Sequence, residues 1–479
     1  MNNIEFINGE KVPLEMHKVR VVQKLKLMPI EDRINAITIA GNNAHLLKNE
    51  DVFLDMLTDS GVNAMSDKQV AAMLEADDAY AGSASYYKLE EKIRKIFDMP
   101  YFLPAHQGRA CEHLLSKVFI KQNDIVPMNY HFTTTKVHVE LAGGKVEELI
   151  TDEGLYVESE VAFKGDMDII KLKQLVERGN IAFVRVEAGT NLIGGQPVSL
   201  RNMRGVSEIC KKHGIKTVLD ASLLSDNIYF NKIREEQCSN MSITEIILEI
   251  SKCFDIIYFS ARKLTSSRGG GMLFRNEEDY TKVRELIPVY EGFSTYGGIS
   301  VREIESMAVG IDDLLDEDFV SQGPIFIAEI TKLLKEVGVP VVTPAGGLGV
   351  HLNCEKFVPH IPKNQYPANS VMSALYIVSG IRGTERGTMS TDKNENGEEV
   401  FSKLELLRLA LPRRVFTLSQ IKYAVDRIIW LYKNSNLIGG LKFIEEPKVL
   451  RFFFGKLEPI GDWQQNLKQK FKQDFKNSL

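Results

Sequence analysis

The chain has 479 residues, 44% of them hydrophobic and 26% charged, with a formal net charge of −5. This length exceeds what one hydrophobic core usually organises, and the interspersed charges leave no basic footprint for nucleic acid. The sequence contains no 18-residue apolar stretch, which a membrane segment would need, and its first residues show no signal pattern for secretion. Five cysteines without paired or metal-type spacing are typical of free thiols, so we expect a cytoplasmic location.

The first half of the chain predicts an α/β domain. After an N-terminal arm, a helix is expected around 29–47. A helix is also expected over 199–213, where Met203, Val206 and Cys210 share one face and Gly214 follows as a stop. Helical patterns alternate with short apolar runs at 100–104, 124–127, 145–150, 181–187, 215–220, 254–260 and 270–274. This alternation predicts a mostly parallel, seven-stranded sheet, buried on both faces, with ligands at its carboxyl edge.

The C-terminal part predicts a smaller α+β domain. Helices are expected near 326–337, 367–379 and 418–433, a strand at 339–343, and an exposed loop over 392–402. The predicted organisation is an arm and part of the small domain at 1–56, a large domain at 57–315, the small domain at 316–460 and a helical tail at 461–479. In that tail Trp463, Leu467, Phe471 and Phe475 recur at four-residue spacing, which favours a helix docked on its own protein over one for a membrane surface or a foreign partner.

Two residues at expected strand ends carry the chemistry. Asp220 ends the apolar run 215–220, and Lys263 follows the run 254–260 just before a glycine-rich strand at 269–274. An amine that forms a Schiff base and a carboxylate that keeps a pyridine nitrogen protonated are what pyridoxal phosphate (PLP) requires. Singly, each residue has an ordinary alternative, a solvated lysine or a helix-capping aspartate.

Further residues predict a cradle for the rest of this cofactor. The turn before the helix from 110, where Gln107, Gly108 and Arg109 offer donors, either binds the phosphate or only caps the helix. Ser260 and Arg262, beside the lysine, supply two more donors of the kind a phosphate needs.

Two other side chains are candidates for the pyridine ring. Phe132 either stacks on the ring or belongs to the core, and Asn191 either donates to the ring hydroxyl or serves turn chemistry.

Long strings connect the chain to a known family. They lie at 57–69, 79–83, 106–109, 132–135, 162–166, 194–198, 289–292, 412–414 and 450–453. On these motifs the chain resembles, almost from end to end, the tyrosine phenol-lyase and tryptophanase family of β-eliminating lyases. The resemblance implies a PLP enzyme of fold type I, a homodimer or homotetramer with active sites shared across the dimer, and activation by potassium.

The resemblance also implies residue roles. Lys263 is the Schiff-base lysine and Asp220 the pyridinium partner, with Phe132 stacked on the ring and Asn191 at its oxygen. The phosphate is cupped by Gln107, Gly108, Arg109 and Ser260. The remaining implied roles are Arg408 for the substrate carboxylate, Tyr80 from the neighbouring subunit for protonating the leaving group, Thr58 and Ser60 for the pocket wall, and Asp78 for the monovalent cation.

Two positions separate the branches of the family. In the phenol-lyase branch a threonine and an arginine hold the phenolic oxygen, and here these are Thr133 and Arg386. The indole-specific branch has an aspartate and an apolar residue instead. Both positions therefore favour a phenolic substrate.

Four positions depart from the family pattern. Leu223 replaces an arginine that donates to the cofactor oxygen, a bond worth about 1.5–3 kcal/mol. His45 replaces a phenylalanine and is either a proton carrier or a polar surface residue. Asp78 replaces a glutamate and Arg268 an asparagine near the cation, which puts potassium dependence in question.

The sequence leaves three hypotheses for function. The leading one is a carbon–carbon lyase that converts tyrosine, or a related aromatic amino acid, into pyruvate, ammonia and a phenol. The second is β-replacement, or elimination from another amino acid, by the same chemistry. The third is a PLP-binding protein of weak activity.

Overall fold

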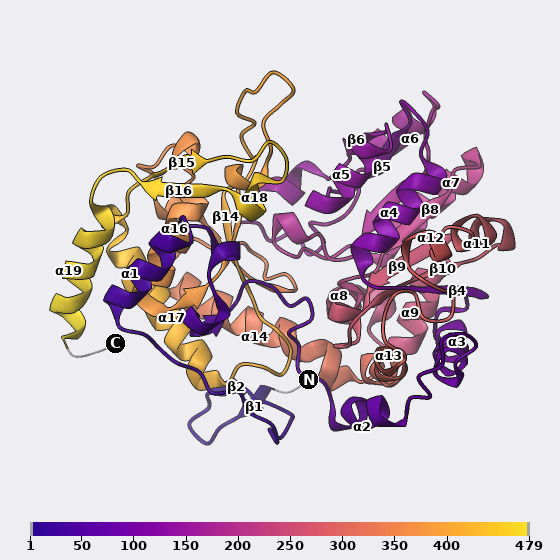
Figure 1. The fold of residues 1–479 in the computed structure, drawn as a ribbon, viewed down its shortest axis with the longest axis horizontal. Coiled ribbons are helices and arrows are strands. Elements are labelled where there is room, and N and C mark those ends of the chain that lie inside the picture. Colours follow the sequence, from indigo (N-terminus) through magenta and orange to yellow (C-terminus); the bar gives the residue numbers. More distant parts are fainter. Residues whose placement is uncertain (1–2, 477–479) are drawn as a thin grey trace. The chain divides into compact units, whose positions relative to one another are not determined.

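The computed structural model describes residues 3–476, which form two compact units. The first unit comprises Asp59–Tyr156 and Val161–Pro324. The second comprises Asn3–Thr58, Val157–Glu160 and the chain from Ile325 onward. The boundary at Pro324 falls inside one long helix, α14 (Glu317–Glu336). Figure 1 labels many of the elements of both units.

A seven-stranded sheet organises the first unit, with the strand order β4-β10-β9-β8-β7-β5-β6. Only β10 runs antiparallel to its neighbours. This confirms the predicted mostly parallel sheet of seven strands. The strands are β4 (Tyr101–Ala105), β5 (Ile125–Met128), β6 (Lys145–Glu148), β7 (Val184–Glu187), β8 (Thr217–Asp220), β9 (Ile256–Ser260) and β10 (Gly270–Phe274).

Successive side chains of a strand point to opposite faces of the sheet, and both faces are buried along every strand except the partly exposed edge strand β6. In β8, Val218 belongs to the core cluster that includes α4, and Leu219 belongs to the cluster on the other face, which includes α7 and α9. The helices of the unit are α2 (Asp67–Glu75), α3 (Ala84–Phe97), α4 (Gly108–Phe119), α5 (Thr133–Leu141), α6 (Ile169–Val176), α7 (Leu200–His213), α8 (Leu224–Arg234), α9 (Ile243–Ser251), α10 (Ala261–Leu264), α11 (Glu277–Arg284), α12 (Ile287–Tyr290) and α13 (Val301–Leu314).

Local sequence signals explain the clearest helix of the unit. The Ser199 hydroxyl accepts the backbone N–H of Asn202 and so caps the start of α7. Gly214 ends it with a left-handed φ of 65°, a conformation that costs glycine little. The helix predicted over 199–213 is confirmed.

The second unit packs helices around a three-stranded antiparallel sheet of order β11-β14-β13. All thirteen residues of α16 are buried, which agrees with its apolar composition on every side. The helices are α1 (Ile30–Ile39), α15 (Cys354–Phe357), α16 (Pro367–Ser379), α17 (Leu418–Lys433), α18 (Arg451–Phe454) and α19 (Trp463–Phe475). The strands are β1 (Asn3–Glu5), β2 (Lys11–Pro13), β3 (Leu54–Asp55), β11 (Gly349–Asn353), β12 (Ile381–Arg382), β13 (Thr384–Arg386), β14 (Leu406–Ala410), β15 (Leu441–Glu445) and β16 (Lys456–Pro459).

Three predicted elements of this unit differ in the structure. The strand expected at 339–343 is wrong, because this segment forms only isolated bridges and Pro340 has no N–H to donate to a ladder. The helix expected over 29–47 ends at Ile39, where Gly41 and Asn42 turn with positive φ. The helix expected from 326 begins nine residues earlier, at Glu317, and contains Pro324.

The terminal helix docks on its own unit, as predicted. Trp463, Leu467 and Phe471 of α19 belong to the hydrophobic core of the second unit, and Phe475 packs against that core. Across residues 3–476, no helix combines the length and the apolar character that crossing a membrane requires.

Candidate active site

Three neighbouring strands of the first unit carry polar side chains in one row. Glu187, the last residue of β7, pairs in register with Asp220, the last residue of β8, and Asp220 pairs with Tyr258 in the middle of β9. Residues paired in register point to the same face of a parallel sheet. The row therefore includes two carboxyl groups at the carboxyl edge, where such sheets bind ligands.

Asp220 is held by three donors. The backbone N–H of Ser222 donates to its Oδ1 at 2.9 Å, and Nη2 of Arg185 donates to its Oδ2 at 2.6 Å. The Tyr258 hydroxyl donates to the same Oδ2 at 3.0 Å. The carboxylate is 5% exposed and thus has a fixed position, as a partner for a pyridine nitrogen needs.

Burial shapes the charges around this carboxylate. Burial raises the pKa of Glu187 to about 7, against the opposing effect of Arg185. Burial and then the Asp220 charge also raise the pKa of Glu112, which lies on α4 and accepts the hydroxyl of Thr134 at 2.7 Å. The buried cation of Arg185 is therefore surrounded by carboxyl groups.

Lys263 lies on α10, directly after β9. Its Nζ is 3.8 Å from Oδ1 of the buried Asp59 and 5.8 Å from the centroid of the Phe132 ring. The structure thus brings together the predicted Schiff-base lysine and the predicted stacking ring. Asp59 is a partner that sequence reasoning missed, although it lies between the two predicted residues Thr58 and Ser60, which are both half-buried.

The predicted phosphate turn lies at the N-terminus of α4. A Cβ added at Gly108 would lie 3.1 Å from Cβ of Ser260, so these two predicted residues are in direct contact. The side chain of Gln107 is hydrogen-bonded to the ring of His106 at 3.0 Å, and that ring is 2.6 Å from Glu291. The close approach of backbone at this helix start suits an anion.

Arginines reinforce the positive charge of this turn. Burial, then Arg268, then Arg109 lower the pKa of Arg262, so the three guanidinium groups act on one another. Gly61, with a φ of +78°, has no side chain and so leaves room for two of these guanidinium groups. A Cβ at this position would lie 2.2 Å from Nη1 of Arg268 and 2.5 Å from Nη2 of Arg262. Such a cluster of like charges is favourable when it binds an anion.

The remaining predicted residues of this unit occupy varied positions. Asn191, in a 3-10 turn after β7, is buried, and its backbone N–H donates to Glu187 at 3.2 Å. Thr133 begins α5 and is half-buried. Tyr80 is 71% exposed, and its ring stacks on Phe293 with the centroids 5.9 Å apart.

Leu223 and Asp78 mark the departures from the family pattern. Leu223 is 3% exposed, and a Cβ at Gly189 would lie 3.0 Å from its Cβ, so the leucine packs on the loop after β7. Asp78 is exposed and pairs with Nε of Arg302 at 3.1 Å. Residues 3–476 contain no group of three His, Cys, Asp or Glu side chains that could hold a metal ion.

The second unit carries a cationic and aromatic cluster. The guanidinium of Arg386 lies 4.9 Å above the Phe452 ring, and His45 contacts Phe452 and Phe453 edge-on, with centroids 4.4 and 5.0 Å apart. Nη2 of Arg408 donates to the backbone carbonyl of Leu57 at 2.8 Å.

His45 is neutral at physiological pH. Burial, and then Arg386, Arg408 and Arg382, lower its pKa to about 3. Its ring is half-buried and contacts two aromatic rings edge-on.

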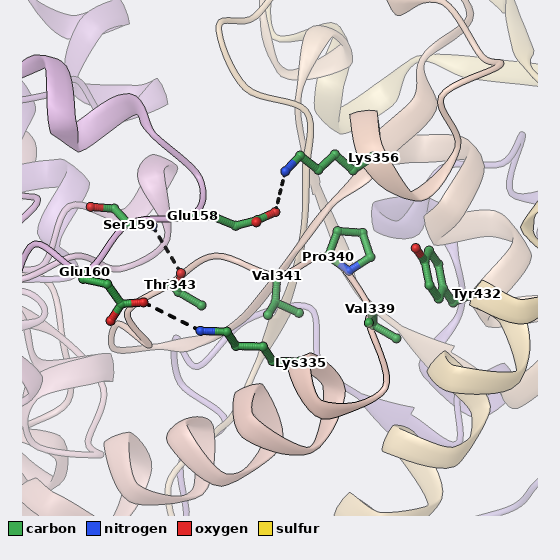
Figure 2. A pocket seen from close by; sticks show the side chains of 11 residues that line it. Glu158, Ser159, Glu160, Lys335, Val339, Pro340, Val341, Thr343, Lys356 and Tyr432 are labelled. Carbon is green, nitrogen blue, oxygen red and sulfur yellow. Dashed lines mark hydrogen bonds and ion pairs between the residues drawn. The ribbon is translucent and has the colours of Figure 1, made fainter.

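A separate pocket of about 520 Å³ also lies in the second unit (Figure 2). Its rim carries two ion pairs, Glu158–Lys356 at 2.8 Å and Glu160–Lys335 at 3.7 Å. The pocket is lined by none of the predicted site residues. Its lining combines these paired charges with a wall of proline and valine side chains.

Similar proteins identify the family. The family model described as beta-eliminating lyase matches residues 55–426. A tyrosine phenol-lyase of Symbiobacterium sp. (strain SC-1) is 41% identical over 452 residues, covering 93% of this chain and 99% of that protein. A tyrosine phenol-lyase of Fusobacterium nucleatum is 40% identical, covering 93% of this chain and 98% of that protein.

Solved structures agree on the fold. A putative kynurenine aminotransferase, Bna3p of Saccharomyces cerevisiae, superposes with a TM-score of 0.61 at 16% identity, covering 83% of this chain and 95% of that chain. The Sphingomonas wittichii serine palmitoyltransferase gives a TM-score of 0.58 at 11% identity, covering 85% of this chain and 97% of that chain. The chain thus belongs to the beta-eliminating lyase family and is a PLP-dependent lyase of fold type I.

Proposed function

We propose that this protein cleaves tyrosine, or a related aromatic amino acid, with water into a phenol, pyruvate and ammonia. The observation that carries the proposal is the sequence identity of about 40% to tyrosine phenol-lyases across 93% of the chain. The positions Thr133 and Arg386, which match the phenol-binding pair of the family, support a phenolic substrate.

The residues of the first unit fit PLP. Asp220 would pair with the ring nitrogen, Phe132 would stack on the ring, and Asn191 would donate to the ring oxygen. The turn of Gln107, Gly108 and Arg109, together with Ser260 and Arg262, would hold the phosphate. When bound, the cofactor supplies the electron-accepting ring that stabilises negative charge at the substrate's α-carbon.

The chain's own residues move the protons. Nζ of Lys263, beside the carboxylate of Asp59, takes the proton from the α-carbon. Arg408 binds the substrate carboxylate, and Arg386 the phenolic oxygen. The hydroxyl of Tyr80 delivers a proton to the ring carbon that leaves, because a carbon leaving group departs only when it is protonated.

The test supplies L-tyrosine to the PLP-loaded protein and measures phenol, pyruvate and ammonia. We expect the three products in equal amounts, and none from Lys263→Ala. In Arg386→Leu, KM for tyrosine should rise while elimination from S-methylcysteine, which has no phenolic oxygen, is preserved. Absence of all three products with PLP bound would refute the proposal.

A second candidate function is elimination or β-replacement on an amino acid with a better leaving group. Two buried features favour it: Leu223 in place of a donor to the cofactor oxygen, and the Asp220 carboxylate bound to Arg185. Both reduce the stabilisation of a carbanion, which matters least when the leaving group departs readily. A rate for S-phenylcysteine more than a hundredfold above that for tyrosine would favour this candidate.

We further propose a cytoplasmic homodimer or homotetramer that shares active sites across the dimer. Five free, buried cysteines support a reducing compartment. We also propose that potassium is dispensable, because Arg302 already neutralises Asp78. Light scattering of the PLP-loaded protein measures the number of subunits in the assembly. Site sharing is tested by mixing Tyr80→Phe subunits with Lys263→Ala subunits. If the site is shared, each mixed dimer has one site with both intact residues and regains activity.

A further inference from the structure

Arg185 is a buried cation in the middle of a predicted apolar strand. It lies on β7, two residues before Glu187 and therefore on the same face of the sheet as the row of Glu187, Asp220 and Tyr258. Its side chain is 1% exposed. A buried cation is costly, and a well-packed apolar residue would usually serve stability as well. Its retention here indicates a role beyond packing.

The contacts of Arg185 converge on Asp220. Nη2 donates to Oδ2 of Asp220 at 2.6 Å, and Nε donates to the Tyr258 hydroxyl at 2.9 Å. The Tyr258 hydroxyl in turn donates to the same Oδ2. On the other side, Nη1 lies 3.6 Å from Oε2 of Glu187. The guanidinium therefore bridges two carboxyl groups and also binds the tyrosine hydroxyl that donates to Asp220.

The hydrogen-bonding capacity of Asp220 limits what else it can bind. A carboxylate has about four lone-pair positions, two on each oxygen. Arg185 and Tyr258 occupy those of Oδ2, and the N–H of Ser222 occupies one on Oδ1. The described contacts leave one position, on Oδ1, for the pyridine nitrogen. A carboxylate already bound to a cation and two further donors has less negative charge to offer to another positively charged partner.

We infer that Arg185 is a positioning residue that shares the Asp220 carboxylate with the cofactor's pyridine nitrogen and thereby weakens the proton affinity of that nitrogen. The inference rests on the proposed pairing of Asp220 with this nitrogen. Glu187 has the opposite influence, because it draws the Arg185 charge away from Asp220. Other charged or titratable groups that face the cluster are Tyr258 on β9, Glu112 and Cys111 on α4 and Lys263 on α10.

The experiment titrates the protein loaded with PLP labelled with ¹⁵N in its ring, because the ¹⁵N chemical shift reports directly whether the nitrogen is protonated. In Arg185→Gln the midpoint of deprotonation should rise by about one pH unit or more, the effect of removing a nearby like charge. Arg185→Lys keeps the charge and should stay close to the unsubstituted protein. Glu187→Gln should shift the midpoint downward.

Opposite shifts distinguish the inference from a structural role. Equal midpoints in Arg185→Gln and Arg185→Lys, or shifts of the same sign in Arg185→Gln and Glu187→Gln, would overturn it. Asp220→Asn tests the underlying pairing separately, because it should deprotonate the nitrogen at neutral pH. An unchanged midpoint in that variant would remove the proposed role of Asp220 itself.

Cofactor affinity gives a second readout that tolerates a loss of stability. 1-Deazapyridoxal phosphate lacks the ring nitrogen, so the ratio of its dissociation constant to that of PLP isolates the nitrogen's contribution. We expect Arg185→Gln to increase this ratio about tenfold, which corresponds to one pKa unit. If both affinities fall equally and the ratio is unchanged, Arg185 acts only on the structure and the inference fails.

Discussion

His45 gives the protein a dependence of stability on acid that a single substitution should remove. The imidazole packs against Phe452 and Phe453 and faces the charges of Arg386 and Arg408. These surroundings disfavour its protonated form. We expect His45→Phe, which keeps an aromatic ring but cannot take a proton, to be more resistant to acid than the unsubstituted protein.

The magnitude follows from the pKa of His45, which is lowered from 6.5 to about 3. Below pH 6.5 the unfolded chain binds a proton at His45 that the folded chain does not bind. The contribution of His45 to the unfolding free energy is therefore fully present above pH 6.5 and is lost as the pH falls towards 3. A pH of 5 lies about 1.5 units below the pKa of this histidine in the unfolded chain. At about 1.36 kcal/mol per unit, the loss between pH 7 and pH 5 is about 2 kcal/mol.

The assay compares urea unfolding of the PLP-loaded protein and of His45→Phe at pH 7 and pH 5. Other histidines titrate in both proteins, so their contributions cancel in the difference between the two. This difference in unfolding free energy should change by about 2 kcal/mol in favour of the variant at pH 5. A difference that is equal at both pH values would show that the folded protein does not hold His45 neutral.

Three further predictions concern other parts of the protein. Gly61→Ala forces a side chain onto a left-handed φ and onto two guanidinium groups, so we expect PLP to bind about tenfold more weakly, a loss of about 1.4 kcal/mol, measured by fluorescence titration. Leu467→Ala removes a fully buried side chain of α19 and should lower the free energy of urea unfolding by about 2–5 kcal/mol. The control Gln465→Ala, at an exposed position of the same helix, should change it by less than about 0.5 kcal/mol. Equal effects of the two substitutions would contradict the docking of this helix. Replacing potassium by sodium should leave kcat unchanged within about twofold, because Arg302 neutralises Asp78; a loss of activity that potassium restores would argue for a bound cation instead.

Much of the fold could be predicted because its signals are local. Seven short apolar runs separated by helical patterns predict a mostly parallel sheet, since strands buried on both faces are usually apolar at successive positions. Asp220 and Lys263 could be assigned to one edge because each follows the end of such a run. Capping residues such as Ser199 and Gly214 marked α7 to within one residue.

Local signals failed where distant contacts override them. The composition of the segment 339–343 predicts a strand, but a ladder depends on neighbouring segments with matching donors, and Pro340 has none to offer. The charged residues Arg185 and Glu187 inside an apolar run were the one visible sign of the buried network, because such residues are buried only when they are paired.

The sequence by itself determined the sheet, its reactive edge and the family. Only the tertiary structure decided which side chains meet there: Asp59 reaches Lys263 across 204 residues, and Arg185 reaches Asp220 across 35. Likewise, His45 contacts Phe452 although the two lie at opposite ends of the chain. Hydrogen bonds and charges act over a few ångströms in space, a separation that the order of residues along the chain does not encode.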